Sequence, residues 1–225
     1  LTIDNAEDFS SSQELRMNKV CRVVCRLCFV CCLLGGVFFL VSCGVDTTGL
    51  SAASSRTMKG PAIASVTVTE YADFQCPACA SAHTLVNKPL EEKYAQKVRF
   101  EFMHFPLRSI HANAYESAQA AECAADQGKF WAFVDIDYVN QKDLSSSMLR
   151  EWGKTLGLNG ELFDRCIRSG IKGKTIMEDV AEGEKIGVRG TPSYFVNGQR
   201  VQISSIEALS AAIDEELSKV KSVPL

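Results

Sequence analysis

The last two thirds of the chain alternate between strand-like and helix-like hydrophobic patterns. Residues 63–71 (IASVTVTEY) are rich in Val and Thr and alternate in polarity, which predicts a strand. Residues 98–105 (VRFEFMHF) alternate in the same way. A helix beginning at Pro77 is predicted between them, and Pro89 is expected to break or kink it. The first predicted order is therefore strand, helix, strand.

Helical periodicity then dominates up to about residue 187. Helical segments separated by glycines or polar stops are predicted at 111–127, 130–140, 147–156, 161–169 and 172–186. Five short helices are more than one connection between two strands needs. We therefore expect an inserted all-helical subdomain over about residues 108–187.

The end of the chain returns to strands. Residues 188–196 combine a glycine-proline turn with a strand pattern, and Asn197-Gly198 is a strong hairpin signal. Apolar residues at helical spacing then predict a final helix over residues 206–217. The predicted fold class is α/β, in one domain over residues 62–225.

The N-terminal part follows a different pattern. Residues 1–16 are polar and acidic, and they are expected to lie upstream of a true start at Met17. Residues 17–43 are predicted to be an export signal, because three basic residues precede an uncharged apolar run at 27–41. That run is short for a membrane span.

The sequence Leu40-Val41-Ser42-Cys43 is similar to a bacterial lipoprotein box, which predicts lipidation of Cys43. Ordinary cleavage nearby and an uncleaved anchor are the alternatives. Residues 44–61 are rich in Ser, Thr, Ala and Gly and are predicted to be a flexible linker.

Charge and cysteine content narrow the possible functions. The formal net charge of -3 provides no electrostatic footprint for nucleic acid, so we expect no nucleic-acid partner. After residue 43 the cysteines are Cys76, Cys79, Cys123 and Cys166. An even number in an oxidising compartment favours pairing, so a structural disulfide between Cys123 and Cys166 is a hypothesis. Two buried free thiols are the alternative.

The sequence Cys76-Pro77-Ala78-Cys79 predicts a redox pair at a helix N-terminus. Proline is well placed at the first helical position, and cysteines three residues apart share a helix face. The helix terminus favours a thiolate, so Cys76 would attack and Cys79 would resolve. Half of a zinc site and a structural disulfide are the alternatives. Zinc needs further ligands at a suitable spacing, and we expect no metal.

Glu70 ends an apolar row on the first predicted strand, just before the redox motif. With alternating side chains it shares a face with Val66 and Val68. A partly buried carboxylate there would have a raised pKa and could take the proton from Cys79. A solvated acid at the strand end is the alternative.

The redox motif after a strand, the helical insertion and the later Gly190-Thr191-Pro192 together resemble the DsbA family. The resemblance implies a thioredoxin fold with an inserted helical subdomain. It implies that Cys76 is the exposed nucleophile, Cys79 the shielded resolving thiol, and Pro192 a cis-proline that holds substrate backbone. Thr191 would contact and tune the disulfide, and Glu70 would be the nearby acid.

The chain departs from the strongest oxidases of that family at Ala78, where they have histidine. An imidazole there stabilises the thiolate, and a more stable reduced form makes a disulfide more oxidising. We therefore expect a less extreme oxidant.

The resemblance implies a thiol:disulfide oxidoreductase of the bacterial envelope that needs no cofactor. Its expected substrates are exported proteins with free thiols, and its expected reoxidant is a DsbB-type membrane protein. A monomer with a lipid anchor is expected. A disulfide reductase or isomerase, or a lipid-anchored binding module on a redox fold, are the alternatives.

Overall fold

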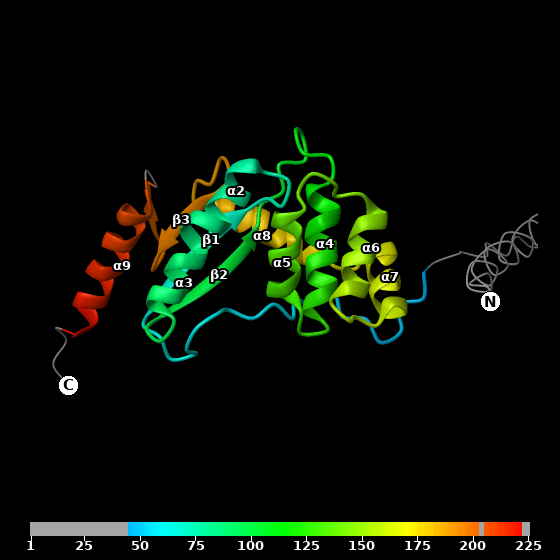
Figure 1. Ribbon diagram of the computed structural model, residues 1–225, viewed down its shortest axis with the longest axis horizontal. Helices are drawn as coiled ribbons and strands as arrows, with labels where there is room; N and C mark the ends of the chain where they lie inside the picture. The colour runs from blue at the N-terminus through cyan, green and yellow to red at the C-terminus, as the bar shows by residue number, and fades with distance from the viewer. Residues whose placement is uncertain (1–44, 203–204, 222–225) are drawn as a thin grey trace, which may run out of the picture. The chain divides into compact units, whose positions relative to one another are not determined.

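The computed structural model describes residues 45–202 and 205–221. Within these residues, four strands form one mixed sheet in the order β2-β1-β3-β4 (Figure 1). The strands are β1 (Val66–Ala72), β2 (Val98–His104), β3 (Ser193–Val196) and β4 (Gln199–Val201). β1 is parallel to β2 and antiparallel to β3, and β3 is antiparallel to β4. The predicted α/β class is confirmed.

The inner strand β1 carries Glu70 into the interior. Val66, Val68 and Glu70 are buried along one face, while the threonines between them are partly exposed. Glu70 lies opposite Phe102 of β2 on one side and opposite Tyr194 of β3 on the other. Glu70 therefore has a neighbouring strand on each side, β2 on one and β3 on the other.

The helix that follows β1 is continuous through Pro89. It consists of α2 (Pro77–Ala82), a π-helical turn η1 (His83–Asn87) and α3 (Lys88–Tyr94). Of the two predicted outcomes at Pro89, a break or a kink, the break does not occur. In the π-turn the Lys88 amide donates to the carbonyl of His83, five residues back. Because this wider turn directly precedes the proline, Pro89 falls in the first turn of α3, where its missing N–H costs little.

The predicted helices of the central block all form, within a few residues of their expected bounds. They are α4 (Ala114–Ala125), α5 (Phe130–Val139), α6 (Ser146–Thr155), α7 (Gly160–Ser169) and α8 (Gly173–Lys185). Side chains of Ser145 and Asn159 cap α6 and α7, and Gly170 ends α7 with φ +64°.

α8 connects this block to the sheet, because it contacts both α4 and β2. A Cβ on its Gly183 would lie 2.9 Å from the Tyr71 ring and 3.0 Å from the Phe105 ring. Glycine is therefore required for the close approach of α8 to the sheet.

Three groups of buried apolar side chains hold the domain together. One is shared by the redox helix, β2 and the helical block, and it includes both redox cysteines. A second joins the sheet to α3 and to α9 (Ile206–Lys221), whose Leu209 and Ile213 are fully buried as the helical spacing predicts. The third surrounds Tyr71 and Phe195.

The segment expected to be a flexible linker contacts the domain. Lys59 and Phe100 exchange backbone hydrogen bonds of 2.8 and 3.0 Å. The Arg56 guanidinium lies 2.7 Å from Asp179 and 2.9 Å from Glu122. The segment therefore touches the domain at Arg56 and Lys59, although most of residues 45–61 are exposed, and its flexibility stays a prediction.

The remaining N-terminal predictions lie outside the described residues. These are the upstream extension 1–16, the signal segment 17–43 and the lipidation of Cys43. Within residues 45–202 and 205–221, no helix is long and apolar enough to cross a membrane.

Candidate functional site

The redox motif forms the N-terminus of α2 as its sequence predicts. Cys76 is the N-cap with extended backbone, and Pro77 occupies the first helical turn. The Cys76 carbonyl accepts the amides of Cys79 at 3.0 Å and Ala80 at 3.2 Å. Cys76 exposes 7% of its surface and Cys79 none, and both are free thiols. Both cysteines are therefore buried, so the expectation of an exposed Cys76 holds only relative to Cys79, which is fully shielded.

The environment of Cys76 favours its thiolate. A hydrogen bond from the Cys79 thiol lowers the pKa of Cys76 to about 5, against the opposing effect of burial. The helix-terminal amides of Ala78 and Cys79 lower the pKa further. A thiolate at neutral pH is the nucleophilic form of cysteine.

The environment of Cys79 has the opposite effect. Burial raises its pKa well above the ordinary value, and the hydrogen bond it donates to Cys76 and the charge of Glu70 add to the rise. One sulfur is thus anionic and the other holds its proton at the same pH. This asymmetry allows one cysteine to attack while the other waits to resolve.

The loop before β3 lies against the leading sulfur. The Thr191–Pro192 peptide bond is cis, and the Cys76 thiol lies 3.4 Å from the Thr191 carbonyl. The Thr191 hydroxyl is buried and has no hydrogen-bond partner within the described residues. A hollow of about 400 Å³ beside this loop is lined by residues including Ala78, Leu85, Pro192 and Arg200. The structure brings the predicted Thr191 and Pro192 to the redox pair.

Glu70 lies in the interior close to the redox pair, and it exposes only 7% of its surface. The Tyr194 hydroxyl lies 2.9 Å from its Oε1, and the Asn87 amide nitrogen lies 2.8 Å from its Oε2. Burial raises the pKa of Glu70 to about 7, although both hydrogen bonds oppose the rise. The carboxyl therefore titrates near neutrality.

Sequence reasoning missed Asn87 and Tyr194. The direction of the Asn87 side chain depends on the π-turn that contains it, and such a turn has no clear sequence signal. Tyr194 follows the cis-proline by two residues, and its place opposite Glu70 depends on strand register. Only the glycine-proline turn before Tyr194 indicated that its strand begins near the site.

Two further residues hold the loop that carries Cys76. The Gln141 side chain donates to the carbonyls of Phe74 at 2.7 Å and Cys76 at 2.8 Å. The buried Asp73 carboxylate accepts the Leu107 amide at 2.7 Å and lies 2.8 Å from Nδ1 of His111. The helical block thus fixes the backbone just before the redox helix.

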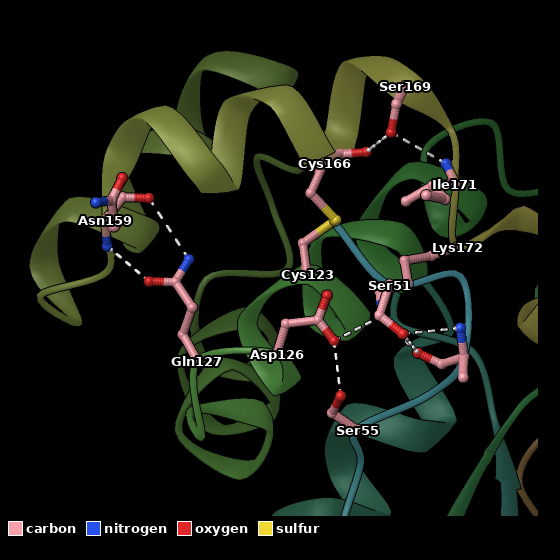
Figure 2. The surroundings of a disulfide bond; sticks show 11 residues. Ser51, Ser55, Cys123, Asp126, Gln127, Asn159, Cys166, Ser169, Ile171 and Lys172 are labelled. Atoms are coloured by element: carbon pink, nitrogen blue, oxygen red, sulfur yellow. Dashed lines mark hydrogen bonds and ion pairs between the residues drawn. A yellow bond between two sulfur atoms is a disulfide. The ribbon is translucent and has the colours of Figure 1, made fainter. Parts of the chain in front are cut away.

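The second cysteine pair lies within the helical block. Cys123 of α4 and Cys166 of α7 form a disulfide with a Cα–Cα distance of 5.9 Å (Figure 2). Both residues are almost fully buried. Beside them Lys172, itself fully buried, lies 2.6 Å from Asp126 and 2.7 Å from the Ala53 carbonyl. The N-terminal segment therefore runs past the disulfide.

The described residues contain no group of three or more metal-ligating side chains. Each histidine instead faces a single carboxylate. The pairs are His83 with Asp135, His104 with Glu122 and His111 with Asp73.

A family model described as thioredoxin matches residues 54–215. The chain belongs to the thioredoxin family. The matched region contains the redox pair, the helical block and the cis-proline, so the whole site lies within the family's domain.

Solved structures share this family fold with its helical insertion. Oxidised BdbD from Bacillus subtilis is 19% identical with a TM-score of 0.67, and it covers 79% of this chain and 98% of its own. The α-DsbA1 of Wolbachia pipientis is 22% identical with a TM-score of 0.63, covering 73% of this chain and 92% of its own. The thioredoxin fold with inserted helices, predicted from the sequence, is confirmed.

The chain is also similar to one part of a longer curated protein. The Na(+)/H(+) antiporter NhaA 3 of Salinispora tropica is 38% identical over 157 residues, which are 69% of this chain and 24% of that protein. The chain therefore spans about a quarter of the length of the curated relatives that it matches.

Proposed function

We propose that this thioredoxin-family domain is a protein thiol:disulfide oxidoreductase of the cell envelope that introduces or exchanges disulfides in exported proteins. The observation that carries the proposal is the opposite perturbation of two neighbouring thiols. The pKa of Cys76 is lowered to about 5, while burial raises that of Cys79, and Thr191 and Pro192 adjoin the leading sulfur. A structural disulfide or a zinc half-site has no need of this asymmetry.

In the oxidising direction, a substrate thiolate attacks the Cys76 sulfur of the disulfide form. The bond between the two enzyme sulfurs breaks, a mixed disulfide forms, and Cys79 leaves with the electron pair and takes up a proton. A second substrate thiolate then attacks the substrate sulfur of the mixed disulfide. The substrate is released with its own disulfide, and Cys76 leaves as a thiolate that its surroundings stabilise.

The roles of the neighbouring residues follow from their positions. Pro192 and Thr191 would hold the substrate backbone against the mixed disulfide, and Glu70 would exchange the proton of Cys79. The methyl side chain of Ala78 contributes no donor to the Cys76 thiolate, so the pair would be a milder oxidant than one with histidine there.

Location and partners form a second part of the proposal. A lipid on Cys43 would hold the domain at a membrane surface, and a DsbB-type membrane protein would reoxidise the pair. The relatives that match this domain are named as antiporters, which supports a position beside a membrane. The chain is expected to act as a monomer on its substrates.

Two assays with the full chain test the proposed activity. Oxidative refolding of a reduced, disulfide-containing substrate should be accelerated by the oxidised protein and not by Cys76→Ala. Insulin reduction distinguishes a reductase, which would be active in that assay and weak in refolding. Inactivity in both assays would refute the redox function and leave the binding-module alternative.

A further inference from the structure

Three side chains from three separate elements meet in a closed triangle beside the redox pair. Tyr194 of β3 contacts Glu70 of β1 at 2.9 Å and Asn87 of η1 at 2.7 Å. Asn87 contacts the second oxygen of Glu70 at 2.8 Å. Each of the three polar groups therefore lies within hydrogen-bonding distance of both others.

The number of available hydrogens decides the protonation of this triangle. Three contacts need three hydrogens, one for each. The Tyr194 hydroxyl supplies one, and the Asn87 amide group can direct one hydrogen into the triangle. An ionised Glu70 supplies none, so one of the contacts would then join two lone pairs. The third hydrogen must come from a protonated Glu70.

This count does not depend on which way the Asn87 amide is turned. In the orientation described, the amide donates to Glu70, Glu70 donates to Tyr194, and Tyr194 donates to the Asn87 oxygen. With the amide reversed, all three bonds run the other way around the ring, and Glu70 again supplies one hydrogen. The protonated carboxyl closes the ring in both cases.

The backbone explains why these three residues meet. In an uninterrupted α-helix, Val86 would share the face of Cys79, seven residues earlier. The π-turn His83–Asn87 contains an extra residue per turn, which shifts this face to Asn87. The antiparallel register places Tyr194 directly opposite Glu70. Only the π-turn and the strand register together complete the triangle.

We infer that Asn87 and Tyr194 are positioning residues that form, with Glu70, a closed ring of three hydrogen bonds holding the proton exchanged with Cys79. This inference rests on the proposed function. When the enzyme disulfide opens, Cys79 leaves with the electron pair and Glu70 gives it the proton. The Tyr194 hydroxyl and the Asn87 amide then both donate to the new carboxylate, and the bond between Tyr194 and Asn87 is lost.

Other titratable groups also act on the ring from the elements around it. The charges of Cys76 and Glu91 raise the pKa of Glu70, and the charge of Glu70 in turn raises the pKa values of Cys79 and of the buried Tyr138. These groups are all present in every ring variant. Their effects on the pKa of Glu70 therefore cancel when the pKa values of the ring variants are compared with each other.

A double-mutant cycle on the pKa of Glu70 tests the ring. The pKa is measured by carbon NMR on the reduced, glutamate-labelled full chain, in the unmodified protein, Tyr194→Phe, Asn87→Leu and the double variant. A Glu70→Gln spectrum assigns the signal. The bond between Tyr194 and Asn87 exists only when Glu70 is protonated. The pKa of Glu70 in the unmodified protein should therefore be about one unit higher than the value obtained by adding the separate effects of Tyr194 and Asn87 to the pKa in the double variant.

The matched control is Tyr94→Phe, which also removes a buried phenol hydroxyl. Tyr94 lies 2.8 Å from Asp214, outside the ring, so its loss should leave the pKa of Glu70 unchanged. Additive effects of the two ring substitutions, or a coupling of opposite sign, would overturn the inference.

A second measurement avoids variants that do not fold. Infrared spectra of the reduced protein are compared at a pH below and a pH above the titration midpoint of Glu70. The difference should contain a band from a hydrogen-bonded carboxylic acid below the midpoint, and Glu70→Gln should lack this band. Absence of that band below the midpoint would overturn the ring. Neither measurement uses catalysis, so the ring can stand if the refolding assay fails, and refolding activity can stand if the ring fails.

Discussion

The two cysteine pairs of this domain belong to the same apolar cluster but differ in chemical state, since one is a pair of free thiols and the other a disulfide. Cys76 and Cys79 are three residues apart at a helix N-terminus, next to Thr191 and a buried acid. Cys123 and Cys166 are 43 residues apart and join two helices within an apolar cluster. The two thiols of the first pair have pKa values shifted in opposite directions, while the second pair is already joined by a covalent bond.

The difference shows what makes a disulfide exchangeable. Exchange needs a stabilised thiolate and access for a partner sulfur. Cys76 has both, since its pKa is about 5 and 7% of its surface is exposed. Cys123 and Cys166 expose 1% and 2% of their surfaces. The two pairs should therefore respond very differently to substitution, reductant and pH.

The largest effect is expected from removing the redox sulfurs. Cys76→Ala should reduce substrate refolding to the uncatalysed rate, because no mixed disulfide can form. Cys79→Ala should also be inactive in refolding, because it cannot form the enzyme disulfide, and its Cys76 thiolate should form a lasting mixed disulfide with an oxidised substrate, since no resolving sulfur is present. Non-reducing electrophoresis and the refolding rate measure both outcomes. Substantial refolding activity in Cys76→Ala would contradict the assignment of the nucleophile.

Removing the second pair should change stability and leave the chemistry intact. A cross-link between residues 43 apart lowers the entropy of the unfolded chain. Its loss in the Cys123→Ala/Cys166→Ala variant should cost about 4 kcal/mol by the loop-closure relation. Denaturant unfolding of the oxidised proteins measures this value. Refolding activity per folded molecule should stay within a factor of about two of the unmodified protein. Loss of activity without loss of stability would show that the pairs are coupled.

The dependence of stability on pH distinguishes the first cysteine pair from the second, because only the free thiols titrate. The folded pKa of Cys76, about 5, lies below its ordinary value of 9.0. Its thiolate therefore stabilises the reduced fold fully above pH 9.0, and this contribution is lost as the pH falls through about 5. The pKa of Cys79 is raised above its ordinary value of 9.0, so the contribution of its protonated thiol to stability is present below pH 9.0 and is lost as the pH rises above it.

Alkylation of the reduced pair should accordingly follow a single titration with a midpoint near 5, which disappears in Cys76→Ala. Cys123 and Cys166 should not react in the folded, oxidised second pair. A midpoint near 9.0 would show that the surroundings of Cys76 do not favour its thiolate.

The smallest expected effect comes from Ala78→His. Ala78 is exposed at the helix N-terminus, so an imidazole there can approach the Cys76 thiolate without displacing the core. The pKa of Cys76 should fall further, and the reduction potential should rise. Titration against glutathione measures the potential, and Ala78→Gln controls for side-chain size. An unchanged or lower potential would contradict the explanation of the missing histidine.

Local rules made much of this molecule predictable. Proline after Cys76 predicted the helix start, glycine stops divided the helical block, and alternation placed Glu70 on the buried face of β1. These features depend on residues a few positions apart, whose geometry the backbone sets directly. The predicted break at Pro89 does not occur, because a π-turn, which has no clear sequence signal, accommodates the proline.

Other features depend on residues that are distant in the chain. Arg56 contacts Asp179, 123 residues later, and composition alone could not predict this contact. Cys123 could be assigned a partner only as a hypothesis, because spacing does not determine the distance between two helices.

The sequence by itself determined the order of strands and helices, the helix start at the Cys76-Pro77-Ala78-Cys79 motif, and the fold family that they resemble. Only the tertiary structure decided that Tyr194 and Asn87 enclose Glu70, and that Arg56 before β1 contacts the helical block. The physical reason is that a helix start or a strand face follows from neighbouring residues. Contacts between distant residues follow from strand register, helix phase and packing, which are settled only when the whole chain has folded.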